Sequence, residues 1–283
     1  MRNLLNQSGL TFALEAHDAI SAKIVEEAGF EMIWASGLTV STALGHRDCN
    51  ELSWTELCKQ WEYMSDATST PILVDGDTGF GNFNNVRQLV KKLCKIGIAG
   101  VCLEDKLFPK TNSFIGENQP LADVEEFCGK IRAGKDSQIG DNFCLIARTE
   151  AFIAGHGLQE ALDRAYAYQE AGADAILVHS KQSTAVEIEA FCSRWEGSAP
   201  LVIVPTKYAQ TPISDFEGLG ISLVIWANHM LRAGIHAMSD AARKIVKNQS
   251  IDGVPMVSVE KLFDMTNQSE LKEAEGKYLA CKN

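Results

Sequence analysis

One pattern repeats eight times along this chain: a short apolar run suited to a β-strand, then polar residues, then a stretch with apolar residues at helical spacing. Strands that read as continuous apolar runs and alternate with helices are typical of parallel sheets covered by helices. Eight such units predict an α/β fold whose sheet closes into a (β/α)8, TIM-type barrel, with a doubly wound open sheet as the alternative. The apolar runs fall at residues 11–16, 32–35, 71–74, 99–103, 143–147, 175–178, 201–204 and 223–226.

The length and composition are compatible with one large domain. The chain has 283 residues with 46% hydrophobic content, which is the size range of single-domain α/β barrels. A break at Gly253 to Pro255 precedes a tail with loosely spaced apolar residues. We therefore expect one barrel domain over residues 1–283, with a helical C-terminal extension from about residue 250.

The charge and the terminal sequence argue against several classes of partner. The formal net charge of −11 disfavours nucleic acid and anionic membranes, because both attract basic surfaces. The first residues, MRNLLNQSGLTF, contain too short an apolar run for a signal peptide, and no run is long enough to cross a membrane. We expect a soluble, cytoplasmic protein. Single, scattered cysteines predict reduced, packed thiols and no disulfide framework or zinc site; they are Cys49, Cys58, Cys94, Cys102, Cys128, Cys144, Cys192 and Cys281.

Acidic residues follow two neighbouring strands, where the carboxyl ends of a parallel sheet form the active face. Asp75 and Asp77 come directly after the strand at 71–74, and Glu104 follows the strand at 99–103. Carboxylates from adjacent units suit Mg2+, which keeps several waters and takes one or two protein ligands. We expect Asp75 to bind the metal directly and Asp77 and Glu104 to act through water. An isolated Asp-x-Asp is otherwise ordinary turn chemistry.

Other polar residues at strand ends are weaker signals. Arg148 can clamp a carboxylate or phosphate, although an ion pair with Glu150 is the alternative. The segment after the second strand begins with Ser-Gly, which can hold an anion or form a turn, and is expected to be a long loop through Asp48. Taken alone, His179 is interpreted as a histidine close to the core, and Trp34 as part of the wall of a site.

The connection from Glu104 to Leu121 is unusually long for a loop between a strand and a helix. Long loops in compact domains are often lids over an active site. The segment Lys110 to Ser113, with sequence KTNS, could donate hydrogen bonds to an anionic substrate. We expect closure of this loop to exclude water, with a solvated surface loop as the alternative.

An ordered set of motifs closely resembles the phosphoenolpyruvate mutase family of the isocitrate lyase superfamily. The motifs are WASGLTVSTALGHRDCNE, VDGDTGFGN, VCLEDKLFPKTNS, IARTEAF, ILVHSK, VPTKY and VIWANH, and the similarity runs from about Leu10 to the C-terminal helices. The resemblance implies a barrel whose eighth helix is swapped between subunits, in a homotetramer built as a dimer of dimers. It also implies a Mg2+-dependent isomerase that converts phosphoenolpyruvate into phosphonopyruvate through a metaphosphate-like state, for phosphonate biosynthesis.

The resemblance also implies roles for individual residues. The catalytic set is Asp48, Lys110, Asn112 and Arg148; the substrate-binding set is Trp34, Ser36, Gly37, Leu38, Thr111, Ser113 and His179; the metal set is Asp75, Asp77 and Glu104.

Two related activities differ from the mutase in the same loop. Lyases of the superfamily that cleave carbon–carbon bonds, such as those acting on 2-methylisocitrate or oxaloacetate, carry a Cys-Gly-His motif there, and residues 109–113 contain no cysteine. Phosphonopyruvate hydrolase is the closer alternative, because the resemblance implies the same acids and arginine but a different residue at Asn112. Gly76 is a departure from the alanine more usual in the mutases. A non-catalytic barrel would have no need for acids and a cation at consecutive strand ends.

Overall fold

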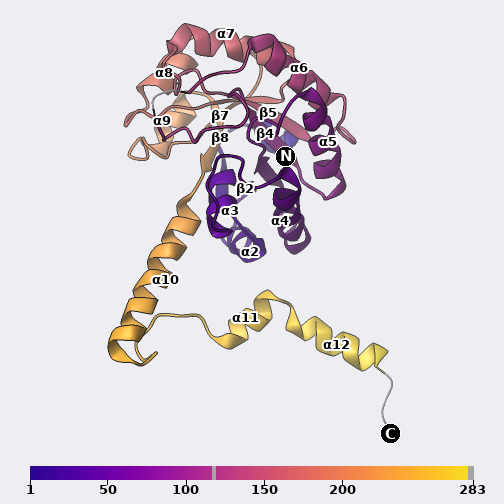
Figure 1. Cartoon of the computed structure of the whole chain (residues 1–283), viewed down its shortest axis with the longest axis vertical. Helices are drawn as coiled ribbons and strands as arrows, with labels where there is room; N and C mark the ends of the chain where they lie inside the picture. Colours follow the sequence, from indigo (N-terminus) through magenta and orange to yellow (C-terminus); the bar gives the residue numbers. More distant parts are fainter. Residues whose placement is uncertain (117–118, 280–283) are drawn as a thin grey trace. The chain divides into compact units, whose positions relative to one another are not determined.

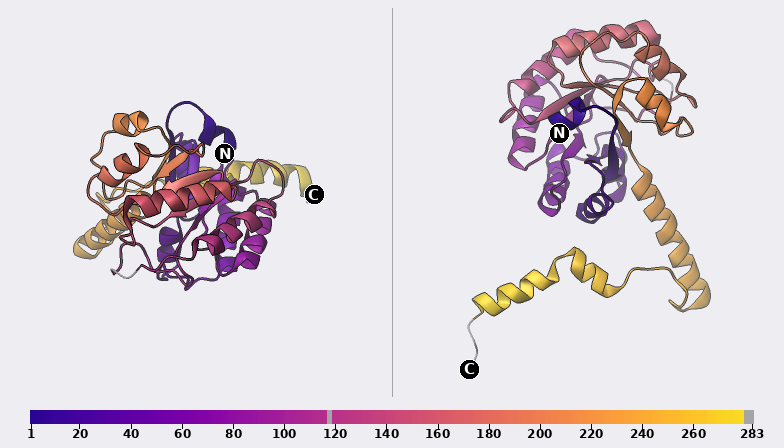
Figure 2. Two further views of the ribbon diagram at one scale, coloured as in Figure 1. Left: turned by 90° about the horizontal axis from the view of Figure 1, so that it is seen from above. Right: turned by 180° about the vertical axis from the view of Figure 1, so that it is seen from behind.

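The computed structural model describes residues 1–116 and 119–279 and contains a closed barrel of eight parallel strands, each paired with its neighbours in sequence order (Figures 1 and 2). Strand β8 pairs with β1 to close the barrel, so the open-sheet alternative is excluded. The strands are β1 (Thr11–Ala16), β2 (Met32–Ala35), β3 (Ile72–Asp75), β4 (Gly100–Glu104), β5 (Cys144–Thr149), β6 (Ala175–Val178), β7 (Leu201–Ile203) and β8 (Ile221–Trp226).

All eight predicted strands are confirmed, with ends that differ by at most two residues from the apolar runs. The main differences lie at the carboxyl ends. Asp75, Glu104 and Arg148 are the last or nearly the last residues of their strands and not the first residues of loops. Hydrogen bonding within the sheet therefore fixes the backbone of these three residues.

A helix follows each strand, and the helices after the first seven strands surround the barrel. Two of them were not predicted. Helix α1 precedes β1, and α3 occupies the start of the segment expected to be a loop through Asp48, so that expectation was wrong for residues 37–43. The helices are α1 (Arg2–Asn6), α2 (Ala19–Glu27), α3 (Gly37–Ala43), α4 (Trp54–Ala67), α5 (Phe83–Lys95), α6 (Val124–Lys135), α7 (Gly157–Glu170), α8 (Val186–Cys192), α9 (Ile213–Gly218), α10 (His229–Asn248), α11 (Val259–Met265) and α12 (Gln268–Tyr278).

The apolar core has two layers, one inside the barrel and one between the strands and the helices. Strand residues that point inward, such as Trp34, Leu73 and Ile146, form the inner layer. At the amino end of the strands, α1 adds the fully buried Leu5 to this layer. Side chains thus fill the interior, as in other barrels of this type, and leave the carboxyl ends of the strands for a site.

The chain divides into two compact units, the first ending at Leu231 and the second beginning at Arg232. The second unit contains most of α10 together with α11 and α12, and the last two lie in the region expected to form a helical extension. Several of its apolar side chains are exposed, including Met238 and Val246. Within the described residues, no helix is long and apolar enough to span a bilayer.

The seven cysteines that fall in the described residues are all free thiols, as predicted. Cys281 lies outside those residues. Burial raises the pKa of several of these thiols, among them Cys58 and Cys102, which keeps them protonated and inert.

Candidate active site

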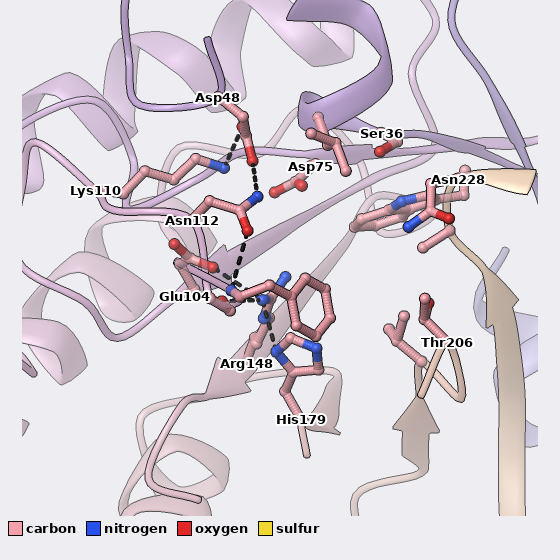
Figure 3. A pocket seen from close by; sticks show the side chains of 16 residues that line it. Ser36, Asp48, Asp75, Glu104, Lys110, Asn112, Arg148, His179, Thr206 and Asn228 are labelled. Atoms are coloured by element: carbon pink, nitrogen blue, oxygen red, sulfur yellow. Dashed lines mark hydrogen bonds and ion pairs between the residues drawn. The ribbon is translucent and has the colours of Figure 1, made fainter. Parts of the chain in front are cut away.

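A pocket opens at the carboxyl ends of the strands, and polar side chains from seven of the eight strand ends and from the loop after β4 line it (Figure 3). Eleven of the fourteen predicted site residues line this pocket: Trp34, Ser36, Leu38, Asp48, Asp75, Glu104, Lys110, Asn112, Ser113, Arg148 and His179. The lining does not include Gly37, Asp77 and Thr111.

Gly37 sets the position of Asp75. Its backbone N–H donates to Asp75 Oδ2 at 3.4 Å, and the N–H of Asp77 donates to Asp75 Oδ1 at 3.2 Å. A Cβ at position 37 would lie 3.2 Å from oxygens of both Asp75 and Asp77, so a larger residue would require these carboxylates to shift. Ser36 caps helix α3 by accepting from the N–H of Thr39 at 3.5 Å. The Ser-Gly pair is therefore helix-start chemistry that also supports an acid of the pocket.

Lys110 joins two of the acids. Its Nζ lies 2.8 Å from Asp48 Oδ1 and 2.5 Å from Asp77 Oδ1, and all three side chains are buried. The amide of Asn50 donates to Asp77 Oδ2 at 2.7 Å and accepts from the backbone N–H of Lys110 at 2.7 Å. Both oxygens of Asp77 are thus occupied by protein groups. This arrangement agrees with a role for Asp77 behind a direct metal ligand.

Three residues of the KTNS segment, Lys110, Asn112 and Ser113, line the pocket, so the surface-loop alternative does not hold for them. Asn112 Nδ2 donates to Asp48 Oδ2 at 2.6 Å, and Ser113 Oγ donates to Glu150 Oε2 at 2.6 Å. Thr111 is exposed, and its carbonyl accepts from Lys106 Nζ at 2.7 Å. The segment therefore brings the side chains of Lys110, Asn112 and Ser113 to the pocket, while Thr111 is held by its backbone.

Arg148 pairs with Glu150, as the alternative interpretation proposed, and also lines the pocket. Its Nη2 contacts Glu104 Oε2 at 3.3 Å, His179 Nδ1 at 2.8 Å and Ser113 Oγ at 3.1 Å. An ion pair and a pocket position are compatible because the guanidinium has five donors in a fixed plane. Glu150 contacts Nε of that plane, and the guanidinium also lines the pocket.

Burial and neighbouring charges shift the pKa values of the site. Burial raises the pKa of Asp77 to about 8, and the nearby Asp75 and Asp48 add to this while Lys110 opposes it. Burial likewise raises the pKa of Glu104, against the attraction of Arg148. For Asp48, burial raises the pKa, but the charge and hydrogen bond of Lys110, the hydrogen bond of Asn112 and the charge of Arg148 together outweigh it, so the pKa is lowered. Burial thus opposes ionisation of Asp77 and Glu104, while the neighbours of Asp48 favour its ionised form.

The charge balance of the site fits a divalent cation. Five carboxylates and three cations form its connected charged set: Asp48, Asp75, Asp77, Glu104 and Glu150 with Lys106, Lys110 and Arg148. With all of them ionised, five acids minus three bases leave two negative charges. Among the described residues no three carboxylate, histidine or thiol groups form a ready metal cage. Mg2+ needs none, since it binds through one or two carboxylates, waters and substrate oxygens.

Unpaired polar atoms mark the inside of the pocket. Glu104 Oε1, Trp34 Nε1 and Thr206 Oγ1 are buried without a hydrogen-bond partner. A buried polar atom without a partner costs about 1–3 kcal/mol, so such atoms together indicate a place where a ligand completes the bonding. Glu104 Oε1 can face a metal-bound water, whereas Trp34 Nε1 donates only.

The pocket also contains residues that sequence reasoning did not assign to it. They are Phe114, Val204, Thr206, Ala227 and Asn228. Thr206 and Asn228 follow β7 and β8, and their position at strand ends was the signal that could have identified them. Phe114 had no such signal, because its ring reaches the pocket only through the path of the loop, where it packs edge-on against His179 with ring centroids 5.8 Å apart.

Gly76 has a structural reason in this chain. A Cβ at this position would lie 2.5 Å from Val101 Cγ2 and 2.8 Å from Leu103 Cδ2. The glycine therefore fits the side chains of β4 packed against it, and the acids on either side keep their places. An alanine here would require Val101 and Leu103 to move.

Comparisons with known proteins agree with this geometry. The family model described as phosphoenolpyruvate phosphomutase matches residues 1–246. A phosphoenolpyruvate phosphomutase of Tetrahymena pyriformis is 51% identical over 282 residues, which cover 99% of this chain and 94% of that protein. A crystal structure of phosphoenolpyruvate phosphomutase from Streptomyces platensis subsp. rosaceus superposes with a TM-score of 0.96 at 40% identity, covering 99% and 98% of the two chains. A phosphonopyruvate hydrolase solved with oxalate and Mg2+ gives 0.93 at 38% identity, with the same coverage.

Proposed function

The chain belongs to the phosphoenolpyruvate phosphomutase family of isomerases, and we propose that it interconverts phosphoenolpyruvate and phosphonopyruvate with Mg2+ as cofactor. One observation carries the proposal: Asp75, Arg148 and the KTNS segment, from separate parts of the chain, meet in a single pocket. Carboxylates for a metal stand beside cations and amides for a phosphoryl group. This combination suits phosphoryl transfer, in which catalysis is mostly positioning and charge stabilisation.

The residues of the pocket can divide the reaction between them. Arg148 is suited to binding the substrate carboxylate in a fork, with His179 and Glu150 holding the guanidinium in place. Asn112 and Ser113 can donate to the oxygens of a metaphosphate-like group as it moves between oxygen and carbon. Mg2+, held by Asp75 with Asp77 and Glu104 reached through water, would supply positive charge for the enolate oxygen.

Asp48 and Lys110 keep the covering segment in place over the transferring group. Lys110 is buried, and the pKa of its ammonium is raised well above the ordinary value: burial opposes the charge, but Asp77 and Asp48 outweigh it. It therefore remains a cation at neutral pH. A closed site matters for this chemistry because water that entered would capture the phosphoryl group.

Phosphorus NMR tests the activity directly. With phosphonopyruvate and Mg2+, we expect phosphoenolpyruvate as the main product, because the resemblance implies an equilibrium in favour of the phosphate ester. Pyruvate and inorganic phosphate as main products would establish the hydrolase instead, which the 38% identical relative keeps as the second candidate. The lyase alternative has less support, because residues 109–113 form the pocket cover without a cysteine. Lack of any Mg2+-dependent turnover would indicate a non-catalytic barrel.

Exposed apolar residues on helix α10 support the proposed homotetramer, a dimer of dimers that exchange their eighth helix. Ile235, Met238, Ile245 and Val246 are 44%, 62%, 37% and 79% exposed. Such residues on one helix are typical of a surface that another chain covers. Light scattering after size exclusion should give the mass of four 30.9-kDa chains, and the mass of one chain would contradict the proposal.

The proposed activity fits a role in cytoplasmic phosphonate biosynthesis. Because the equilibrium favours phosphoenolpyruvate, synthesis would need a following reaction that consumes phosphonopyruvate. A steady release of phosphonopyruvate by the isolated protein, without such a reaction, would argue against this role.

A further inference from the structure

Lys106 and Glu150 are buried charged residues next to the pocket. In the proposed reaction they act only through the residues that they contact. Lys106 is two residues after the end of β4, and Glu150 follows β5. Their side chains are 2% and 0% exposed and form an ion pair of 3.3 Å between Lys106 Nζ and Glu150 Oε2. Neither lines the pocket.

Both residues hold the KTNS segment. Lys106 Nζ donates to the carbonyl of Thr111 at 2.7 Å and to Ser113 Oγ at 2.8 Å, and Ser113 Oγ donates to Glu150 Oε2 at 2.6 Å. Asn112 lies between these two attachment points. The three contacts thus fix the residues on both sides of the amide that enters the pocket.

The carboxylate of Glu150 also contacts two residues that line the pocket, Arg148 and His179. Glu150 Oε1 contacts Arg148 Nε and lies 2.7 Å from His179 Nδ1, while its backbone N–H donates to Asp105 Oδ1 at 2.8 Å. One oxygen of Glu150 therefore contacts Arg148 and His179, and the other accepts from Ser113 of the covering segment. If residues 111–113 moved away, Lys106 would lose two of its partners while buried, which carries a large cost for a charge.

We propose that Lys106 and Glu150 are positioning residues that clasp Thr111–Ser113 over the pocket and so decide whether the phosphoryl group returns to the enolate or goes to water. The inference rests on the proposed function. In either outcome the C–P bond of phosphonopyruvate breaks and its electron pair stays with the pyruvate enolate. Phosphorus then bonds to the enolate oxygen, giving phosphoenolpyruvate, or to a water oxygen, giving phosphate, and the proton lost by water goes to the enolate carbon to give pyruvate.

The test measures product partition in Lys106→Met, with Lys106→Arg as the conservative variant. Phosphorus NMR with phosphonopyruvate and Mg2+ should show the phosphate share of product rise about fivefold or more in Lys106→Met, and return toward wild type in Lys106→Arg. A change in stability alone would slow the protein's turnover through lost folded protein without changing the ratio of products. An unchanged ratio in a folded Lys106→Met protein would overturn the proposal.

A second readout needs no turnover. Phe114, which directly follows the clasped residues, is an exposed chymotrypsin site at 39% exposure. Cleavage there should be about fivefold faster in Lys106→Met and also faster in Ser113→Ala, a loop substitution that leaves the ion pair intact. If Lys106→Met does not fold, Ser113→Ala decides: wild-type cleavage would overturn the clasp. If wild type makes no phosphoenolpyruvate, the proposed function fails, and cleavage still tests the clasp.

Lys135→Met is the matched control. Lys135 pairs with Asp174 at 2.7 Å near the amino ends of the strands, so its loss also removes a lysine from an ion pair. This variant should unfold at a lower temperature yet keep the wild-type product ratio and the wild-type cleavage rate in the loop. Equal changes in Lys135→Met and Lys106→Met would assign the effect to general destabilisation and overturn the proposal.

Discussion

The two ends of the barrel both bury ionic groups, but they differ in how completely those groups are paired. At the amino end, Asp174 receives Lys135 at 2.7 Å, Arg2 at 2.8 Å and the backbone N–H of Leu145 at 2.7 Å. These bonds tie helices α1 and α6 to the strand starts. The network joins parts of the chain that are far apart in sequence and leaves both oxygens of its acid satisfied.

At the carboxyl end, the charged set contains two more acids than bases, and Glu104 Oε1 and Thr206 Oγ1 have no partner. Such a site is less favourable on its own than a fully paired one. Both ends contain buried ionic groups, but both oxygens of Asp174 at the amino end have partners, whereas Glu104 Oε1 at the carboxyl end has none. Complete pairing is therefore typical of an ionic group that stabilises the fold, and incomplete pairing of one that binds a ligand.

Asp75→Ala, at the carboxyl end, should have the largest effect of these variants: a loss of turnover without a loss of stability. The substitution removes the acid that lines the pocket, so we expect turnover to fall about 10³-fold or more. The unfolding temperature should hold, because the carboxylate accepts only two long backbone hydrogen bonds. Phosphorus NMR and thermal unfolding measure the two effects. Wild-type turnover in this variant would remove the metal assignment.

Asp174→Ala, at the amino end, should lower stability and leave turnover unchanged. It leaves Lys135 and Arg2 without their partner, at a cost of about 2 kcal/mol in the free energy of unfolding, less than for a fully buried pair because Arg2 is 39% exposed. Denaturant titration measures the loss, while turnover per folded molecule should match wild type. A specific loss of turnover would show that the two ends are not independent.

Gly37→Ala tests how closely the pocket end is packed. The added methyl would press on oxygens of Asp75 and Asp77, so we expect kcat/KM to fall about tenfold with little change in stability. Gly129→Ala, within α6 and with no atom within 4 Å of its added Cβ, is the control. It should keep full turnover and gain about 0.5–1 kcal/mol of stability. Equal kinetics in the two variants would contradict the assignment of Gly37.

Glu26→Gln is the smallest test, again at the amino end. Hydrogen bonds from the side chain of Ser69, and then from its backbone and from Thr70, lower the pKa of Glu26 below its ordinary value of 4.5. A lowered folded-state pKa adds stability above the ordinary value and loses it as the pH falls through the folded one. The variant should be about 0.5 kcal/mol less stable at pH 7 and equal to wild type near pH 3. A pH-independent difference would contradict this origin.

Periodicity allowed all eight strands to be predicted, because buried parallel strands are continuous apolar runs. Helix α3 was missed because GLTVSTA is rich in weak helix formers; the Ser36 cap and the burial of Thr39 and Val40 stabilise it instead. The acids and Arg148 could be assigned to one site because the carboxyl ends of parallel strands lie on the same face of a barrel.

The length of the loop and its donor groups predicted a covering segment at Lys110 to Ser113, but the partners of these residues could not be predicted at all. Lys106 meets Ser113 seven residues away, but Ser113 meets Glu150 across 37 residues, through the path of a loop. No local pattern encodes such a contact. The sequence nevertheless placed Lys106 and Glu150 within two residues of strand-end acids and of Arg148.

Trp34 provides the protein with an optical reporter of its own site. The indole is 2% exposed, lines the pocket and has an N–H without a partner. Its emission depends on the polarity and hydrogen bonding around that group, so a ligand that accepts the bond should shift the fluorescence without any turnover. Titration with oxalate and Mg2+, compared in wild type and Trp34→Phe, would separate this signal from those of the other four tryptophans and follow binding at the barrel mouth in real time.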